Sequence, residues 1–356
     1  MRGKFRVLFI GAEGIHLSRW IEYFKQIYEV KHLIFKTNPP SNETCFYING
    51  DLSKLKKLLQ YRKFLRQYNP DIIIFHYIDY KTVLSLFSYN TPCVLVGYGY
   101  DVFEAPKRSF FFKKYFKFVA NKSAKVFSIA EHMTAEMIEY IGVNKKKIYT
   151  TAWGCDTKIF YRNMTIEKNK EGIRIICPRG FEPHYNWRTL ISAINEIIKK
   201  KKNVLLILTG TGSEEQEAKR MTVSLNLENY IEFRGFLKPE ELAAEYNKAN
   251  IYISLSLIDG NNISLNEAMA CGAFPICSNI PAASQWITHN KNGFLLKNNF
   301  SYLELADLII SYNTNKDLIL SAEILNYDIL SESADFSKNM QKISCVLKEL
   351  NQNNAI

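Results

Sequence analysis

Two carboxylates, Asp259 and Glu267, stand with seven residues between them in this 356-residue chain. Carboxylate oxygens accept hydrogen bonds from hydroxyl groups. Asn262 or Ser264 can cap a helix that starts between them, and the first backbone N–H groups and the positive dipole end of such a helix favour a bound phosphate. The stretch could therefore bind a molecule in which hydroxyl groups flank a diphosphate, as in a nucleotide sugar. An ordinary strand–turn–helix unit with solvated acids would show the same pattern.

A strand and a helix must position these groups. The short apolar run 251–257 has the length of a buried strand, and the polar residues Asp259–Asn262 close it. A helix should follow and end at Cys271-Gly272, where Gly tolerates positive φ. Residues 273–277 then form the next buried strand.

The block DGNNISLNEAMACGAFPICSNIPA resembles the donor-site signature of the GT-B retaining glycosyltransferases of family 4, also called glycosyltransferase group 1. Members of that family usually carry two Glu separated by seven residues before a Met-Ala-Cys-Gly-type helix end. Here Asp259 replaces the first Glu, a variant typical of members that make bacterial surface polysaccharides, and its reach is one methylene shorter. The resemblance covers nearly the whole chain, is strongest over 173–281 and is weaker over 1–120.

The resemblance implies a donor site built largely by the second half of the chain. Glu267 would bind donor hydroxyls, Asp259 would bind the sugar, and Arg179 would hold the diphosphate with the helix after Asn262. A guanidinium keeps its charge and presents a planar fork, so Arg179 can offset the charge on a departing nucleoside diphosphate. The Lys that the family usually has a few residues later is missing, and His184–Asn186 occupy its region. The implied donor-binding residues are Gly11, Gly14, Arg179, Asn186, Gly210, Gly212, Phe236, Asp259, Gly260, Asn261, Asn262, Ile263, Ser264 and Glu267.

The loop after the first strand resembles a ligand loop of the same family. It reads Gly11-Ala-Glu-Gly14 and lacks the GxGxxG spacing of a dinucleotide fingerprint. The two glycines would let the backbone approach the ligand. The pattern His-x-x-Arg-Trp follows, and the resemblance implies that His16 and Arg19 lie near the acceptor. Taken alone, His16 also fits a polar residue at a helix terminus.

The fourth strand of the first half leads to Tyr100-Asp101, where many family members have His-Asp. Tyr100 stands in place of the His that touches the donor sugar, which leaves its role open. Asp101 matches and is an acceptor-side candidate, as a hydrogen-bonding partner or a base, and a plain turn residue is the alternative. The implied catalytic residues are Asp101, Arg179, Asp259 and Glu267, and the implied acceptor-side residues are His16, Arg19, Tyr100 and Asp101.

Strand-like and helical runs alternate along the chain, which predicts parallel sheets wrapped by helices, with ligands at the carboxyl ends of the strands. With the resemblance, this predicts an α/β protein of the GT-B fold, with two Rossmann-like parallel-sheet domains facing a cleft and a C-terminal helix returning to the first. We place an N-terminal acceptor-binding domain at 1–165, a nucleotide-sugar-binding domain at 166–330 and the returning helix within 331–356. The expected strands are 5–12, 30–36, 71–77, 93–99, 125–130, 147–154, a run starting at 173, 204–210, 231–236, 251–257 and 273–277.

Positive charge is concentrated in the first half. Residues 1–165 carry 26 Lys and Arg against 13 Asp and Glu, and the whole chain has a formal net charge of +11. Two segments, Ser53–Arg66 and Lys107–Lys125, interleave cations with Leu, Phe and Tyr. Because a basic amphipathic helix can lie in a lipid headgroup layer, the first half is expected to face an anionic membrane surface. Helices with core aromatics and solvated cations are the alternative, and nucleic acid ranks lower because no nucleic-acid motif accompanies the charge.

Other classes of protein are disfavoured. No run of about 18 apolar residues suggests a transmembrane helix, and residues 5–12 are interpreted as a strand and not as a signal peptide. The seven Cys form no CxxC pair, and no Asp-x-Asp pair offers carboxylates to a metal. We therefore expect a reduced, cytosolic protein without a metal cofactor.

Together these observations predict a metal-independent, retaining glycosyltransferase of polysaccharide biosynthesis. It would move a sugar from a nucleotide-sugar donor, implied to be a UDP-sugar, to a lipid-linked saccharide. It would be a peripheral protein on the inner face of a bacterial plasma membrane. The alternatives are a GT-B sugar-nucleotide epimerase or hydrolase and a non-catalytic nucleotide-sugar-binding subunit, for which Asp259 and the missing Lys and His would be signs of decay.

Overall fold

The computed structural model describes residues 4–36, 45–168, 171–200 and 202–354. Its contacts divide the chain into unit 1, which is Met1–Ala152 with Ser337–Ile356, and unit 2, which is Trp153–Phe336. The sequence analysis placed the first boundary later, at 165. The structure assigns the intervening segment to unit 2 because Phe160 packs beside Tyr246, with ring centroids 6.0 Å apart. Residues 169–170 of the expected second domain, and residues 355–356 of the C-terminal segment, lie outside the described residues.

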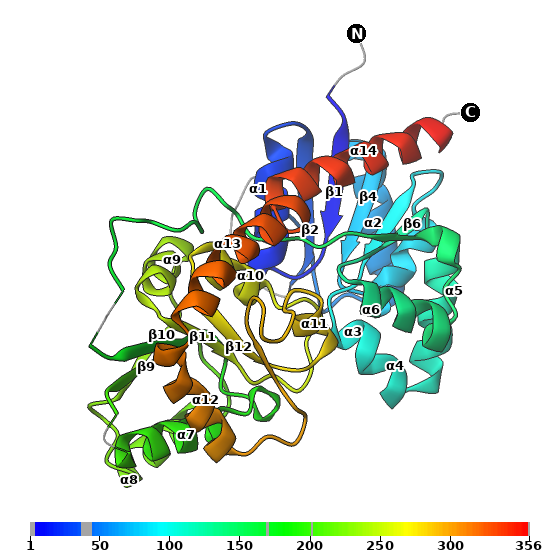
Figure 1. Cartoon of the computed structure of the whole chain (residues 1–356). Helices are drawn as coiled ribbons and strands as arrows, with labels where there is room; N and C mark the ends of the chain where they lie inside the picture. The colour runs from blue at the N-terminus through cyan, green and yellow to red at the C-terminus, as the bar shows by residue number, and fades with distance from the viewer. Residues whose placement is uncertain (1–3, 37–44, 169–170, 201, 355–356) are drawn as a thin grey trace. The chain divides into compact units, whose positions relative to one another are not determined.

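Unit 1 is built on a parallel sheet (Figure 1). Within the described residues the sheet has seven strands in the order β3-β2-β1-β4-β5-β6-β7. Because the chain adds β2 and β3 on one side of β1 and then places β4 on the other side, a topological switch point lies between the carboxyl ends of β1 and β4. The strands are β1 (Arg6–Ile10), β2 (Glu29–Phe35), β3 (Cys45–Ile48), β4 (Ile72–His76), β5 (Cys93–Val96), β6 (Lys125–Ser128) and β7 (Ile148–Thr150).

Helices surround this sheet. The apolar strands β1, β4 and β5 are buried along nearly their whole length, as expected for parallel strands covered on both faces. The α-helices are α1 (Ile15–Lys25), α2 (Lys54–Tyr68), α3 (Tyr100–Phe103), α4 (Ala105–Arg108), α5 (Phe110–Lys122), α6 (Glu131–Ala135) and α14 (Phe336–Asn354). Shorter helical turns are η1 (Tyr80–Phe87), η2 (Glu136–Ile141) and η3 (Lys145–Lys147).

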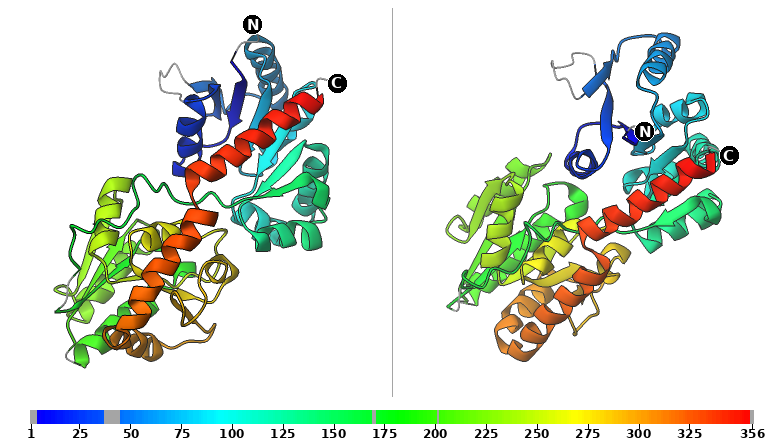
Figure 2. Two further views of the ribbon diagram at one scale, coloured as in Figure 1. Left: turned by 45° about the horizontal axis from the view of Figure 1, so that its top comes forward. Right: turned by 90° about the horizontal axis from the view of Figure 1, so that it is seen from above.

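The C-terminal helix α14 packs on unit 1, and Figure 2 shows it in red beside the strands of that unit. It buries Met340, Ile343 and Leu347. The hydroxyl of Ser344 is hydrogen-bonded to the hydroxyl of Tyr28 in unit 1. The helix is therefore part of the first unit although it is last in the sequence.

Unit 2 repeats the design of unit 1. In the described part of the chain its parallel sheet has six strands in the order β10-β9-β8-β11-β12-β13. The switch point lies here between β8 and β11, which are paired to each other in parallel. The strands are β8 (Ile173–Cys177), β9 (Val204–Thr209), β10 (Ile231–Gly235), β11 (Ile251–Ser254), β12 (Phe274–Ser278) and β13 (Phe294–Leu296).

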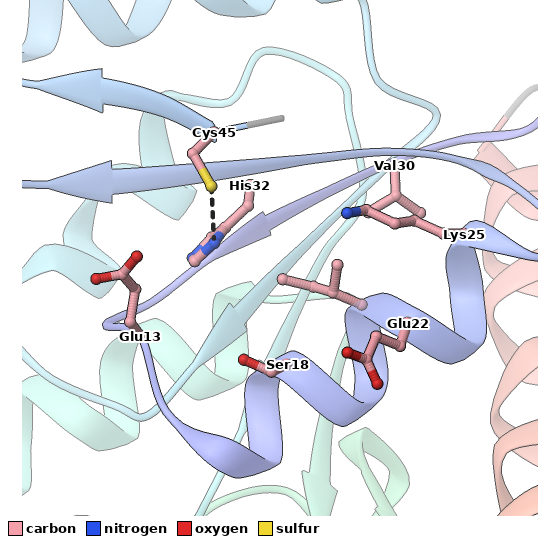
Figure 3. A pocket seen from close by; sticks show the side chains of 8 residues that line it. Glu13, Ser18, Glu22, Lys25, Val30, His32 and Cys45 are labelled. Atoms are coloured by element: carbon pink, nitrogen blue, oxygen red, sulfur yellow. Dashed lines mark hydrogen bonds between the residues drawn. The ribbon is translucent and has the colours of Figure 1, made fainter. Parts of the chain in front are cut away.

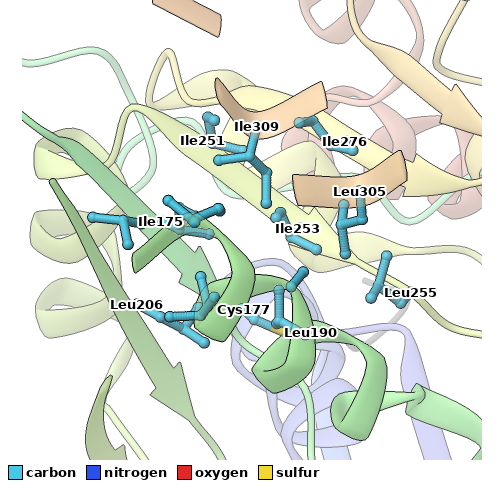
Figure 4. Packing of buried hydrophobic residues seen from close by; sticks show 14 of the residues in the cluster. Ile175, Cys177, Leu190, Leu206, Ile251, Ile253, Leu255, Ile276, Leu305 and Ile309 are labelled. Carbon is cyan, nitrogen blue, oxygen red and sulfur yellow. The ribbon is translucent and has the colours of Figure 1, made fainter. Parts of the chain in front are cut away.

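The core of unit 2 lies between this sheet and the helices on it. Figure 4 shows apolar side chains of β8, β9, β11 and β12 packed against those of α7 and α12. The helices are α7 (Trp187–Lys199), α8 (Glu215–Ser224), α9 (Pro239–Lys248), α10 (Ile263–Ala270), α11 (Pro281–Ser284), α12 (Tyr302–Ser311), α13 (Lys316–Ser333), η4 (Pro183–Tyr185) and η5 (Tyr312–Thr314).

The structure confirms each expected strand, with ends that shift by a few residues. The sequence analysis missed two strands, β3 and β13. Both are short, and β3 and β13 lie at the edges of their sheets. A short edge strand carries too few residues for its periodicity to be recognised.

Candidate functional site

Arg179 lies just beyond β8, at the switch point of unit 2. Its Nη2 donates to Asp259 Oδ2 at 2.7 Å and also to Asn262 Oδ1, and its Nε donates to Ser254 Oγ at 3.1 Å. The side chain is 13% exposed, and the Tyr185 ring lies 5.6 Å from its guanidinium carbon. The structure thus brings together Arg179, Asp259 and Asn262, which the sequence assigned to one site.

The amide oxygen of Asn262 is the centre of this network. It accepts hydrogen bonds from Tyr252 Oη at 2.8 Å, Ser264 Oγ at 3.1 Å and the backbone N–H of Leu265 at 3.2 Å. The bond to Leu265 confirms Asn262 as the N-cap of α10. Gly272, with φ of 79°, ends the helix region as expected. The start of α10 is therefore fixed beside the Arg179 guanidinium.

The electrostatics of the site favour a charged guanidinium. Burial alone would lower the pKa of Arg179, but the neighbouring Tyr252 and Asp259 raise it well above its usual range. Burial also raises the pKa of the Tyr252 hydroxyl. Arg179 therefore carries its charge at every working pH, and Tyr252 stays neutral and able to donate a hydrogen bond.

The glycines of the neighbouring loop allow close backbone packing. A Cβ on Gly212 would lie 2.4 Å from the backbone nitrogen of Phe181, and one on Gly210 would lie 3.2 Å from the carbonyl oxygen of Arg179. Gly210 also has φ of 102°. These glycines support the loop that carries Arg179, and their contact with the donor stays a prediction.

Other predicted donor residues have definite positions in unit 2. Asn261 is buried, and its side-chain oxygen accepts from Trp286 Nε1 at 3.1 Å, so its amide holds α11 in place. Asn186 adopts the left-handed conformation before α7, and its oxygen accepts from the Thr189 hydroxyl at 2.7 Å. Gly260 is buried, and Ile263 and Ser264 lie half-buried in the first turn of α10. Phe236 is 65% exposed.

Glu267 lies one turn into α10 and is 8% exposed. Burial is the main cause that raises the pKa of the Tyr246 hydroxyl, and the charge of the Glu267 carboxylate is the second. The two side chains are therefore near neighbours. The hydrogen bonds from Glu267 to donor hydroxyls stay a prediction.

In unit 1, the first residue of the loop after β1 is Gly11, which packs closely against β4. A Cβ on Gly11 would lie 3.1 Å from the His76 Cβ, so Gly allows β1 and β4 to approach where they end. Gly14 faces open space, and α1 starts directly after it. His16 and Arg19 lie half-buried in the first turns of α1.

An aromatic group gathers where β1, β4 and β5 end. The Tyr98 ring lies 6.0 Å from His16, 5.8 Å from His76 and 5.9 Å from Tyr77, measured between ring centroids. Tyr98 Oη and His76 Nδ1 are 2.7 Å apart. Burial lowers the pKa of His76 well below its usual range, so this imidazole is neutral.

Asp101 lies at the start of α3 and helps to hold the loop before it, which fits the turn residue given as the alternative in the sequence analysis. It is fully buried, and its carboxylate accepts from the backbone N–H groups of Ile78 at 2.9 Å, Tyr98 at 3.0 Å and Gly99 at 2.9 Å. A carboxylate with these three partners holds two loops together and is not placed to take a proton from an acceptor. Tyr100 beside it is 49% exposed, with the Arg108 guanidinium carbon 5.4 Å from its ring centroid.

A cavity of about 170 Å³ lies beside α1 in unit 1 (Figure 3). His32 lines it, with Nε2 bonded to the Gly11 carbonyl oxygen at 3.0 Å and Nδ1 3.8 Å from Cys45 Sγ. Burial lowers the pKa of His32. The His32 imidazole thus lines the cavity and also bonds to the loop after β1.

The sequence analysis missed several members of these networks, above all Tyr252, Ser254, His76 and Tyr98. Tyr252 and Ser254 belong to an apolar run that predicts a buried strand. The one signal that could have identified them as site residues is their place near the end of β11, at the switch point. In the described ranges 4–36, 45–168, 171–200 and 202–354, no group of three or more His, Cys, Asp or Glu could hold a metal ion.

Two family models match the chain: Glycosyl transferases group 1 over residues 163–327 and Glycosyl transferase 4-like over residues 6–130. A glycosyltransferase from Rickettsia africae has a similar fold, with a TM-score of 0.81 at 17% identity, covering 99% of this chain and 100% of that one. The chain therefore has the GT-B fold, and each of its halves matches a glycosyltransferase family model.

Further similarities fit this assignment. Anabaena HepE, solved with UDP and glucose, matches this chain with a TM-score of 0.80 at 16% identity, covering 97% of this chain and 100% of that one. The GtfA subunit of a UDP-N-acetylglucosamine–peptide N-acetylglucosaminyltransferase from Limosilactobacillus reuteri is 23% identical over 333 residues, which is 83% of this chain and 64% of that protein. The chain spans 24% to 64% of the length of the curated relatives it matches.

Proposed function

We propose that this glycosyltransferase moves a sugar from a UDP-sugar to a lipid-linked saccharide, with retention of configuration and without a metal ion. The observation that carries the proposal is the Arg179 guanidinium held beside the start of α10, at the switch point between β8 and β11. A permanent cation and a helix N-terminus together form a site for a diphosphate. The UDP and sugar found with the similar Anabaena structure support the choice of donor.

The proposed chemistry relies on this cation. The acceptor oxygen forms a bond to the sugar anomeric carbon while the bond from that carbon to the diphosphate breaks, and the acceptor proton passes to the leaving phosphate oxygen. Negative charge grows on the diphosphate during this step, and Arg179 and the α10 amides offset it. Asp259 is paired with Arg179 at 2.7 Å, so it supports the cation and is not placed as a free nucleophile.

The lipid-linked acceptor is proposed from the surface of α5. Phe110, Phe111 and Phe118 are 62%, 82% and 52% exposed on this helix, while Phe112 and Phe116 on its other face are buried. Exposed Phe beside Lys is the composition of a helix that lies in a headgroup layer. No helix in the described residues has the length and apolarity to span a membrane. We therefore propose peripheral attachment to the inner face of the plasma membrane.

A donor panel tests the proposal. UDP-glucose, UDP-galactose and UDP-N-acetylglucosamine should be hydrolysed slowly in the absence of acceptor, at the same rate with and without excess EDTA. Glu267→Ala should lower this rate by about 10² or more, because hydrogen bonds to a charged partner contribute roughly 1.5–3 kcal/mol each. A strict requirement for Mn²⁺ or Mg²⁺ would show that the mechanism is wrong, and interconversion of UDP-glucose and UDP-galactose without hydrolysis would indicate an epimerase.

A further inference from the structure

Tyr77 has a backbone conformation that its side chain disfavours. Among the described non-glycine residues with positive φ, four are Asn, namely Asn69, Asn186, Asn226 and Asn290, and two are Tyr, namely Tyr77 and Tyr89. Asn tolerates the left-handed region because its short side chain bonds locally, whereas a bulky residue there is strained. Such strain persists where the surrounding structure enforces it, often at a ligand site.

The position of Tyr77 matches that expectation. It follows β4 directly, with φ of 73°, at the switch point between β1 and β4 of unit 1. In unit 2 the same position in the topology, after β8 and β11, holds Arg179 and Asp259. The carboxyl ends at a switch point are where α/β sheets bind ligands.

Polar contacts on both sides hold Tyr77 in place. Its N–H donates to the Val96 carbonyl oxygen at 3.1 Å, and the next N–H, that of Ile78, donates to the buried Asp101 carboxylate at 2.9 Å. Its ring packs at 62° against Tyr98, whose hydroxyl is bonded to His76. The fold thus fixes the ring although 38% of the residue is exposed.

We propose that the exposed Tyr77 ring, held edge-on by Tyr98, forms a platform on which a pyranose ring of the acceptor saccharide stacks. This inference rests on the proposed function. The C–H face of a pyranose ring packs on an aromatic face. The platform gives unit 1 a way to recognise an uncharged sugar ring.

The variants exploit the backbone conformation. Tyr77→Asn removes the ring and introduces the residue that this chain has at its other left-handed positions, so the protein should fold with a Tm near that of the parent. Tyr77→Phe keeps the ring. Tyr89→Asn is the matched control, since Tyr89 has φ of 54° but packs near Arg62 and Arg66, away from the switch point.

The first measurement detects acceptor binding directly and starts with the parent protein. Saturation-transfer NMR on the parent protein with octyl β-glucoside, octyl β-galactoside and octyl N-acetyl-β-glucosaminide should show saturation at pyranose ring protons of at least one glycoside. Tyr77→Asn should abolish that signal, whereas Tyr89→Asn should preserve it. Saturation confined to the octyl chain for all three glycosides would overturn the platform.

Transfer kinetics with the same glycosides give the second measurement. Tyr77→Asn should raise the acceptor KM about tenfold, as expected for the loss of an aromatic contact. Donor hydrolysis should stay at the parent rate, and Tyr77→Phe should behave like the parent. The inference would be overturned if Tyr77→Asn had the same acceptor KM as the parent. It would also be overturned if Tyr89→Asn raised the acceptor KM as much as Tyr77→Asn does. Failure of the parent to hydrolyse any UDP-sugar would instead contradict the proposed function.

Discussion

At the scale of single residues, Arg179 is the side chain on which the proposed donor site depends. Its nearest carboxylate is Asp259, 80 positions later in the sequence. The other Arg of the region, Arg188, is committed elsewhere, with its nitrogens 2.8 Å from Glu214 and 2.7 Å from Glu217. The charge on a leaving diphosphate must therefore be offset by Arg179 and by backbone amides.

Arg179→Ala should lower turnover by about 10³, the upper range for the loss of one transition-state donor. Arg179→Lys should recover only part of this, because Lys keeps the charge but lacks the planar fork. Donor affinity should fall less than turnover, since charge on the diphosphate is greatest during bond cleavage. Calorimetric donor Kd values beside single-turnover rates check this expectation.

Arg188→Ala is the matched control for Arg179→Ala, and it should turn over the donor at the parent rate. An equal fall in affinity and turnover for Arg179→Ala would assign Arg179 to uniform binding. Leaving-group stabilisation would then belong to the amides of α10.

At the scale of elements, strand β11 fixes the start of helix α10. Tyr252 lies in β11 and is fully buried, and its hydroxyl is 2.8 Å from Asn262 Oδ1 and 3.0 Å from Ser264 Oγ. A buried hydroxyl with two partners locks the helix start and thereby the direction of its free N–H groups. We expect Tyr252 to act as a positioning residue for the diphosphate, through α10 and Arg179.

Tyr252→Phe should weaken UDP binding about fivefold to tenfold, because one or two buried hydrogen bonds of roughly 1 kcal/mol are lost. Tyr246→Phe is its control. The Tyr246 hydroxyl is buried and has no hydrogen-bond partner in the described residues, so its removal should leave Tm unchanged or slightly higher. Calorimetry with UDP and thermal unfolding measure both effects, and equal UDP affinity in the two variants would remove Tyr252 from this role.

At the scale of the whole molecule, the charge is divided unequally along the chain. Its basic first half carries the helix α5, whose Phe residues are divided between core and surface. Phe112 and Phe116 are core residues, while Phe110, Phe111 and Phe118 are exposed. Lys114 lies 4.5 Å from the centre of the Phe110 ring, so cations and exposed aromatics share one face.

Binding to vesicles with anionic lipids should weaken steeply as salt rises, because the Debye length shrinks from about 10 Å at 0.1 M to about 3 Å at 1 M. Phe111→Ser should weaken binding further without loss of Tm, since Phe111 is 82% exposed. Co-sedimentation with anionic and neutral vesicles measures both effects. Equal binding to both kinds of vesicle would favour solvated helices without a membrane role.

The sequence by itself determined the local elements. Apolar runs marked the parallel strands, Asn262 marked the start of α10 and Gly272 its end, because these signals act over a few neighbouring residues. The family signature around Asp259 and Glu267 could also be recognised from the sequence, since its residues are contiguous, and it predicts that the second half of the chain binds the donor.

Only the tertiary structure decided which distant side chains meet. It paired Asp259 with Arg179, buried Asp101 under three backbone amides, divided the Phe residues of α5 between core and surface, and placed the strained Tyr77 at a switch point. Apart from the division of the α5 Phe residues, which depends on helix packing, these outcomes depend on how separate strands pack at the carboxyl edge of a sheet. The partner of a polar side chain there is set by packing, which local sequence patterns do not encode.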